Sequence, residues 1–100
     1  MKVTWTQEAL DCLEDIRDYL AVQEKSPQAA IDTLNSIFSR ESQIQDMPHS
    51  GRSVPEYNQT NLREIIDGSY RIIYLICESE IFVLTVVHQS RIKWQIVKPI

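Results

Sequence analysis

Apolar positions near the start of the chain recur with the period of an α-helix. The segment before them, Lys2–Trp5, alternates and is rich in β-prone residues, which predicts a short strand. Thr6 then offers an N-cap hydroxyl, and Glu8 places an acid in the first turn, where the helix dipole favours it. A helix is therefore predicted over about residues 7–24, and its apolar face consists of Ala9, Leu13, Ile16 and Leu20.

A second helix follows almost at once. Ser26-Pro27 places an N-cap residue before a proline at the first helical position, which is a strong start signal. The apolar stripe then continues from Ala30 to Ile44, so this helix is predicted to end near Gln45. Because the link between the two helices is so short, they are expected to form an antiparallel hairpin.

The second half of the chain changes to short apolar runs separated by turn residues. Pro48 and Gly51 end the helical region, and residues 53–61 lack any period and are interpreted as a loop. Asp67-Gly68 lies between two apolar runs, which is a good hairpin signal. Three strands in an antiparallel meander are predicted: Leu62–Ile66, Tyr70–Cys77 and Ile81–His88.

The last two of these strands are apolar at nearly every position. A strand that is exposed on one side should alternate between apolar and polar residues, so these two are expected to lie centrally. Helices would cover one face, and the segment 90–100, a partner chain or both would partly cover the other. The sequence thus predicts an α+β fold with a short N-terminal strand, an antiparallel helical hairpin and a three-stranded antiparallel meander, as one domain over residues 1–100.

Charge is distributed unevenly along the chain. Net charge is −4 with a pI near 5.0, and residues 1–46 hold nine acids against four bases, whereas residues 47–100 hold five against six. An acidic protein lacks the broad positive field on which nucleic-acid binders depend, so direct nucleic-acid binding is not expected. Lys2 is followed at once by a polar, alternating segment, so no signal peptide is expected, and no apolar run is long enough to span a bilayer. We therefore expect a cytoplasmic protein with no membrane partner.

Candidate chemistry is confined to a few basic residues on or beside the predicted sheet. The chain has no Gly-rich phosphate loop and no metal-ligand spacing, so no cofactor and no metal are expected. Arginine can stabilise a phosphoryl group and histidine can act as an acid or base, which would indicate phosphate chemistry. Alternatively, Arg71 could pair with Glu64 or Glu56, and His88 could merely end a strand. The candidates are Arg52, Arg63, Arg71, His88 and Arg91.

Three segments of this half carry a resemblance to a known family. MPHSGRSVPE (Met47–Glu56), LREIIDGSYRIIY (Leu62–Tyr74) and IFVLTVVHQSR (Ile81–Arg91) resemble, in order and spacing, the RelE/ParE superfamily of bacterial toxin–antitoxin toxins. The resemblance implies the same order of strand, two helices and three strands. The residues that match the family pattern are Gly51, Arg52, Pro55, Glu56, Arg63, Tyr70, Arg71, Tyr74, His88 and Arg91.

Within the superfamily the chain looks most like ParE, the plasmid stabilisation toxin. That resemblance implies the toxin of a type II toxin–antitoxin system, which poisons DNA gyrase, binds a ParD-like antitoxin and is not an enzyme. The alternatives are a ribosome-dependent mRNA interferase similar to RelE, or a degenerate non-toxic member that only binds antitoxin.

For the nuclease, the resemblance implies specific roles. Arg71 matches the arginine that RelE-type enzymes place on the scissile phosphate, and His88 lies near the acid/base position of some members. Arg63 and Arg91 are looser matches. This sequence departs from the nuclease pattern in two ways: Gln89 follows His88 where an aromatic residue would be expected, and no lysine lies between Lys25 and Lys93.

Overall fold

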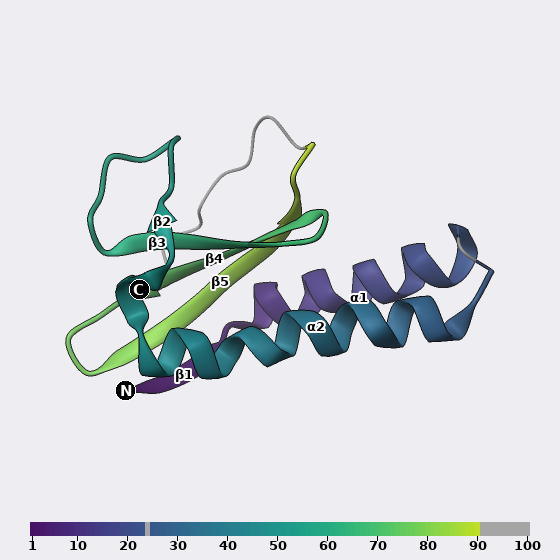
Figure 1. Cartoon of the computed structure of the whole chain (residues 1–100), viewed down its shortest axis with the longest axis horizontal. Helices are drawn as coiled ribbons and strands as arrows, with labels where there is room; N and C mark the ends of the chain where they lie inside the picture. Colours follow the sequence, from purple (N-terminus) through teal and green to yellow (C-terminus); the bar gives the residue numbers. More distant parts are fainter. Residues whose placement is uncertain (24, 91–100) are drawn as a thin grey trace.

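The computed structural model describes residues 1–23 and 25–90 (Figure 1). Arg91 and the rest of the C-terminal segment considered as a cover for the sheet lie outside the described residues. The elements follow the predicted order with two additions, a three-residue 3-10 helix and a two-residue strand. They are β1 (Lys2–Trp5), α1 (Gln7–Gln23), α2 (Pro27–Asp46), a 3-10 helix (Pro48–Ser50), β2 (Arg52–Ser53), β3 (Leu62–Asp67), β4 (Tyr70–Ile76) and β5 (Glu80–His88).

The five strands form one mixed sheet in the order β1-β5-β4-β3-β2. β3, β4 and β5 make the predicted antiparallel meander, and β4 and β5 are central as their apolar sequences predicted. Two pairings go beyond the prediction: β1 joins β5 in parallel, and β2 pairs antiparallel with β3. Ser53, assigned to a loop, is thus a strand residue opposite Arg63.

Local signals in the sequence account for the helix start and the first hairpin turn. The Thr6 hydroxyl accepts a hydrogen bond from the Ala9 amide at 3.2 Å, as an N-cap should. Ser26 occupies the N-cap position of α2 with Pro27 after it, although its side chain makes no capping hydrogen bond. Between β3 and β4, Gly68 has a φ of +57°, a backbone conformation that other residues adopt with strain.

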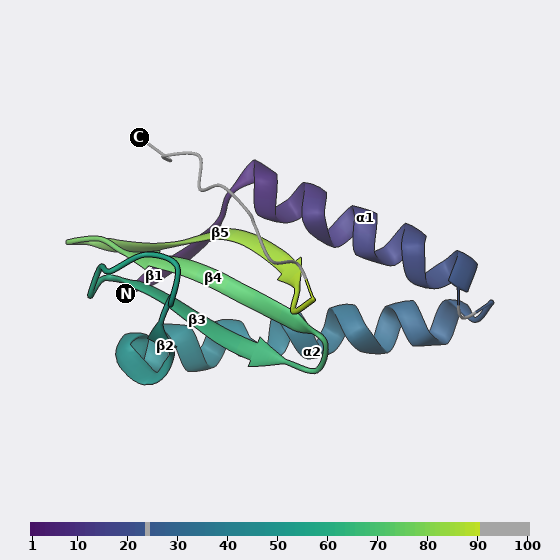
Figure 2. The same cartoon turned by 90° about the horizontal axis from the view of Figure 1, so that it is seen from above.

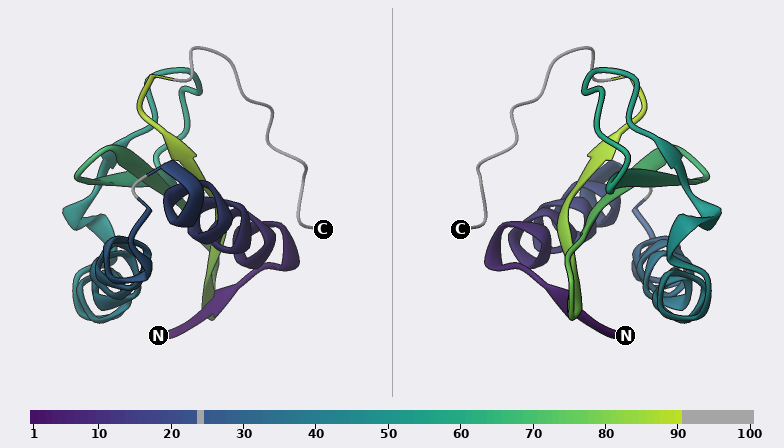
Figure 3. Two further views of the ribbon diagram at one scale, coloured as in Figure 1. Left: turned by 90° about the vertical axis from the view of Figure 1, so that its right-hand side faces the viewer. Right: turned by 90° about the vertical axis from the view of Figure 1, so that its left-hand side faces the viewer.

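Both helices lie on the same face of the sheet, with α1 running along β5 (Figures 2 and 3). We call this the helix face. Each helix turns its apolar stripe toward the sheet, and the resulting core holds most of the fully buried side chains. This core includes Ala9, Leu13 and Ile16 from α1, Ile37 and Ile44 from α2, and Ile65, Ile72, Tyr74 and Val83 from the strands.

The opposite face is covered in part by the segment 54–61, which leaves β2 and arches over the sheet (Figure 3). We call this the loop face. Val54 and Tyr57 pack there against strand residues, closing a second, smaller core. The segment 54–61, whose sequence showed no period, therefore provides part of the cover that was expected over the apolar strands β4 and β5. The strand residues beneath it are Leu62, Ile73, Leu84 and Val87, with Leu75 and Phe82 beside them.

Within the described ranges, neither helix combines the length and the apolar character needed to cross a bilayer.

Candidate functional site

The sheet register separates the candidate residues of the sequence onto opposite faces. Arg71 lies opposite Val87, which belongs to the loop face, whereas Tyr70 lies opposite His88. Residues that are directly opposite share a face, and successive residues alternate between faces. The Tyr70 and His88 rings meet edge to face with centroids 5.5 Å apart, on the helix face. Arg71 and His88 therefore do not converge on one site.

On the loop face, Arg71 is held by two carboxylates. Its Nε and Nη2 donate to Oε1 of Glu64 at 2.8 and 2.5 Å, while Nη1 and Nη2 donate to the two oxygens of Glu56 at 2.8 and 2.7 Å. Arg71 is only 6% exposed and Glu64 only 1%. Both partners suggested by the sequence are thus engaged at once, in the paired geometry that guanidinium favours.

A second arginine completes this cluster. Arg52 Nε donates to Oε2 of Glu64 at 2.5 Å, so the buried carboxylate lies between two arginines. The hydrogen bonds that Arg71 donates to Glu56, followed by those to Glu64, raise the pKa of Arg71 above its ordinary value, although burial acts to lower it. We call Arg52, Glu56, Glu64 and Arg71 the buried ion cluster. It ties β2, β3, β4 and the 54–61 segment together, and a phosphate could reach Arg71 only by displacing carboxylates.

Other family-pattern residues form a second structural contact, at the end of the helical hairpin. The Tyr74 hydroxyl donates to the Pro48 carbonyl at 2.5 Å and accepts from the Gly51 amide at 3.1 Å. A Cβ on Gly51 would lie 2.5 Å from Tyr74 Oη and 2.7 Å from the Glu64 carbonyl oxygen, so only glycine fits. Burial raises the pKa of Tyr74. Arg63 closes the same corner by donating to the carbonyls of Thr60 and Gly51 at 2.8 and 3.2 Å.

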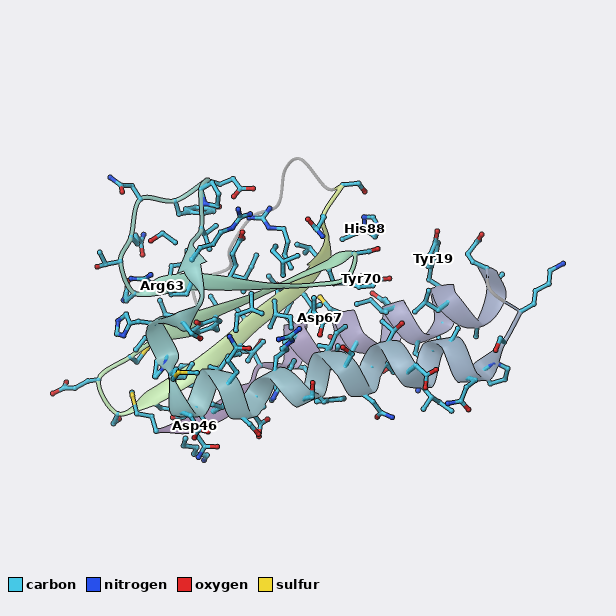
Figure 4. The ribbon with its side chains drawn as sticks, in the orientation of Figure 1. Tyr19, Asp46, Arg63, Asp67, Tyr70 and His88 are labelled. Atoms are coloured by element: carbon cyan, nitrogen blue, oxygen red, sulfur yellow. The ribbon has the colours of Figure 1, made fainter. Side chains whose placement is uncertain are left out.

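On the helix face, His88 and Tyr70 border an open region instead. A hollow of about 560 Å³ is lined by α1 and the end of β5, and another of about 550 Å³ by both helices and the β3–β4 turn. The two hollows share Tyr19, Tyr70 and His88, and Figure 4 shows these side chains near the end of the sheet, with Tyr19 rising from α1. We call the combined region the Tyr70 groove. Sequence reasoning did not identify it, although Tyr19 is the neighbour of Leu20, which belongs to the predicted apolar face of α1.

Among the described residues, His88 has a local hydrogen-bond partner and no cluster of metal ligands is present. His88 ends β5, and its Nδ1 lies 2.7 Å from the Ser90 hydroxyl and accepts from the Ser90 amide at 3.1 Å. No three His, Cys, Asp or Glu side chains within residues 1–23 and 25–90 gather as metal ligands would. Arg91, the remaining nuclease candidate, lies outside those ranges.

The order of elements and of strands defines the class of protein. Residues of this chain superimpose on a structure described as the chromosomal ParDE TA system from P. aeruginosa, with a TM-score of 0.74, 20% identity, and coverage of 88% of this chain and 95% of that one. They also match the toxin–antitoxin complex RelBE2 from Mycobacterium tuberculosis, with a TM-score of 0.50, 19% identity, and coverage of 88% and 96%. Both likenesses show that the fold is that of RelE/ParE toxins.

The sequence identifies the branch of this class. A sequence model of the family described as ParE toxin of type II toxin-antitoxin system, parDE, matches residues 3–93. The chain therefore belongs to the ParE toxin family. Among curated proteins, no sequence matches it.

Proposed function

We propose that this protein is a growth-inhibiting toxin that binds DNA gyrase and stalls it with DNA cleaved, and that a ParD-like antitoxin restrains it. Membership of the ParE family supports the general activity. The proposal for gyrase rests on the family resemblance together with the geometry of the residues that a nuclease would need.

The observation that carries the proposal is the separation of Arg71 from His88. The arginine that resembles the RelE phosphate ligand is 6% exposed and bound to two carboxylates on the loop face. The histidine that would act as acid or base lies on the helix face, packed against Tyr70. General acid–base catalysis requires both groups within hydrogen-bond reach of the same reacting atoms, so this arrangement favours a toxin that acts by binding a protein.

Surface character also favours a protein target. The helical hairpin carries the acidic half of the chain, which would repel a nucleic-acid backbone. It also exposes several large apolar side chains, which often mark interaction surfaces. Those on the two helices are Leu10, Tyr19, Val22, Ile31 and Phe38. We propose that the antitoxin covers part of this hairpin and the adjoining sheet.

A supercoiling assay with purified gyrase tests the target. Added toxin should inhibit negative supercoiling in proportion to its dose and should accumulate linear, cleaved plasmid. The antitoxin encoded beside the toxin gene should abolish both effects. If gyrase is unaffected at every dose, the proposed target is wrong.

The nuclease alternative is tested in the same cells. After toxin induction, primer extension on abundant messages should reveal no new cut sites, and His88→Ala should arrest growth as well as the wild type does. His88 is the informative position because it is exposed at a strand end. New cuts that vanish in His88→Ala would establish the interferase instead. Harmless expression without antitoxin would identify a non-toxic member.

A further inference from the structure

The Tyr70 groove holds a polar group without a hydrogen-bond partner among the described residues. Tyr70 is a buried residue, 9% exposed, and it lines both hollows. Within residues 1–23 and 25–90 its hydroxyl makes no hydrogen bond, whereas no fully enclosed polar side-chain atom there lacks one. The hydroxyl must therefore open into the groove. A buried side chain that presents an unsatisfied hydroxyl to a hollow is suited to meet a ligand there.

The walls of the groove are acidic and aromatic. Asp15 from α1 lines the first hollow, and Asp32 from α2 lines the second. Asp67 also lines the second hollow, but it is already engaged by Ser36 and by Arg40 at 3.2 Å. No lysine or arginine among the described residues lines either hollow. Tyr19, which is 58% exposed, and Tyr70 add two phenol rings to these carboxylates.

This combination selects a cation with an aliphatic stem. A guanidinium or ammonium group can donate to the Tyr70 hydroxyl and to a carboxylate while lying against the ring faces. The floor of the first hollow adds apolar side chains, Ile16 and Val86, along which the stem of a long basic side chain can lie. An acidic partner surface would be repelled by Asp15 and Asp32.

We propose that the Tyr70 groove binds an arginine or lysine side chain from the ParD-like antitoxin. The identity of that partner rests on the function proposed above, whereas the choice of a basic side chain rests on the groove. The acids in the first half of α1, Glu8, Asp11 and Glu14, would attract the same basic segment during approach.

Binding of the full-length toxin to the antitoxin encoded beside it tests this inference. Tyr70→Phe removes only the hydroxyl, and Asp15→Asn removes one charge without changing shape. Each should raise Kd by roughly tenfold, because Tyr70→Phe removes a hydrogen bond to the basic group and Asp15→Asn removes the negative charge that pairs with it. Asp18→Asn is the matched control: it lies on the same helix, changes net charge equally and does not line the groove, so Kd should change by less than about twofold.

The basic residue of the antitoxin can be located in the same assay. Each lysine and arginine of the antitoxin is replaced in turn by glutamine. The Kd of each antitoxin variant is then measured with the wild-type toxin and with the Asp15→Asn toxin. One of these replacements should weaken wild-type toxin about tenfold and have little further effect on the Asp15→Asn toxin, which is the signature of direct coupling. Absence of any coupled position would overturn the inference.

Failure of the inference and failure of the proposed function give different results. If Tyr70→Phe and Asp15→Asn bind antitoxin as tightly as the wild type, the groove assignment is wrong, while gyrase inhibition by the toxin alone is unaffected. If gyrase is not inhibited but the variants lose antitoxin binding, only the proposed target fails. A change in the Tyr70 ring resonances of the free toxin on Arg91→Glu would assign the groove to the chain's own terminal segment and overturn the inference.

Discussion

Tyr70 and Arg71 are adjacent on β4, yet their side chains lie on opposite faces of the sheet and differ in their hydrogen-bond partners. Arg71 enters the buried ion cluster, where Glu56 and Glu64 bind its guanidinium from two sides. Tyr70 enters the core below, and its hydroxyl reaches a hollow bordered by acids. Both residues match the family pattern, so the match alone does not separate a structural role from a binding role. The hydrogen-bond partners do separate them.

The two tyrosines of β4 repeat the same contrast on one face. The Tyr74 hydroxyl holds Pro48 and Gly51 in place, whereas the Tyr70 hydroxyl has no partner among the described residues. A satisfied polar group stabilises the fold, while an open one costs little to remove and is available to a ligand. The two hydroxyl groups should therefore differ in what their removal does to stability and to binding.

Glu64→Ala should cause the greatest loss of stability. It would remove one of the carboxylates that bind the buried Arg71 and would also remove the partner of Arg52. Breaking a buried ion pair on one side costs about 3–5 kcal/mol. Urea denaturation followed by circular dichroism measures this. Asp18→Ala, which breaks an exposed pair with Arg17, should change the free energy of unfolding by less than about 0.5 kcal/mol. Equal effects would mean that the buried ion cluster contributes nothing beyond a surface pair.

Gly51→Ala should cause the next largest loss, lowering the free energy of unfolding by about 1–3 kcal/mol. The new methyl group would overlap the Tyr74 hydroxyl and the Glu64 backbone. Gly68→Ala provides the comparison. A Cβ there meets nothing within 4 Å, so its cost is limited to the positive φ, about 1 kcal/mol after the gain in unfolded-state entropy. Thermal unfolding of the two variants ranks them, and a more damaging Gly68→Ala would contradict the close packing at Gly51.

Removal of one oxygen from each tyrosine tests the contrast directly. Tyr74→Phe should destabilise by about 1–3 kcal/mol, because the Pro48 carbonyl and the Gly51 amide lose their partner. Tyr70→Phe should change stability by less than about 0.5 kcal/mol and should affect antitoxin binding instead. Parallel urea titrations and binding measurements give both quantities. A large stability loss in Tyr70→Phe would show that its hydroxyl has an internal partner.

The pH dependence of stability should show the smallest effect. Burial raises the pKa of both Tyr74 and Tyr70 above the ordinary value of 10.0. The folded chain therefore holds these protons more tightly than the unfolded chain, so stability is unaffected below pH 10 and falls as pH rises above it. Urea midpoints measured from pH 8 to pH 11 should decline only at the alkaline end. The decline should be shallower in Tyr74→Phe, and a rise in stability would contradict the stated direction.

Much of the fold was predictable because the signals are local. Helical periodicity, the Thr6 cap, Pro27 and the Gly68 turn each depend on residues close in sequence, and the structure confirms all these elements within a residue or two. The segment 53–61 had no such signal. Its ordering depends on distant partners, through Arg52 and Glu56 bound to the cluster and Val54 packed in the second core.

The relative placement of Arg71 and His88 could not be predicted from the sequence. Alternation along β4 was enough to place Tyr70 and Arg71 on different faces, but it could not place His88, which belongs to another strand. That placement depends on the register between β4 and β5, in which Leu84 is an extra residue between the pairs Ile73↔Thr85 and Tyr74↔Val83. One additional residue reverses every side chain beyond it, and no local pattern records where it falls.

By itself, the sequence determined the order of the elements, the helical hairpin, the central apolar strands and the family, because periodicity, turn chemistry and ordered motifs are properties of neighbouring residues. Only the tertiary structure decided that β1 pairs in parallel with β5, that two glutamates form ion pairs with Arg71, and that Tyr70 and His88 line an acidic groove. These depend on which distant residues the register and the packing bring into contact, and that is a property of the whole folded chain.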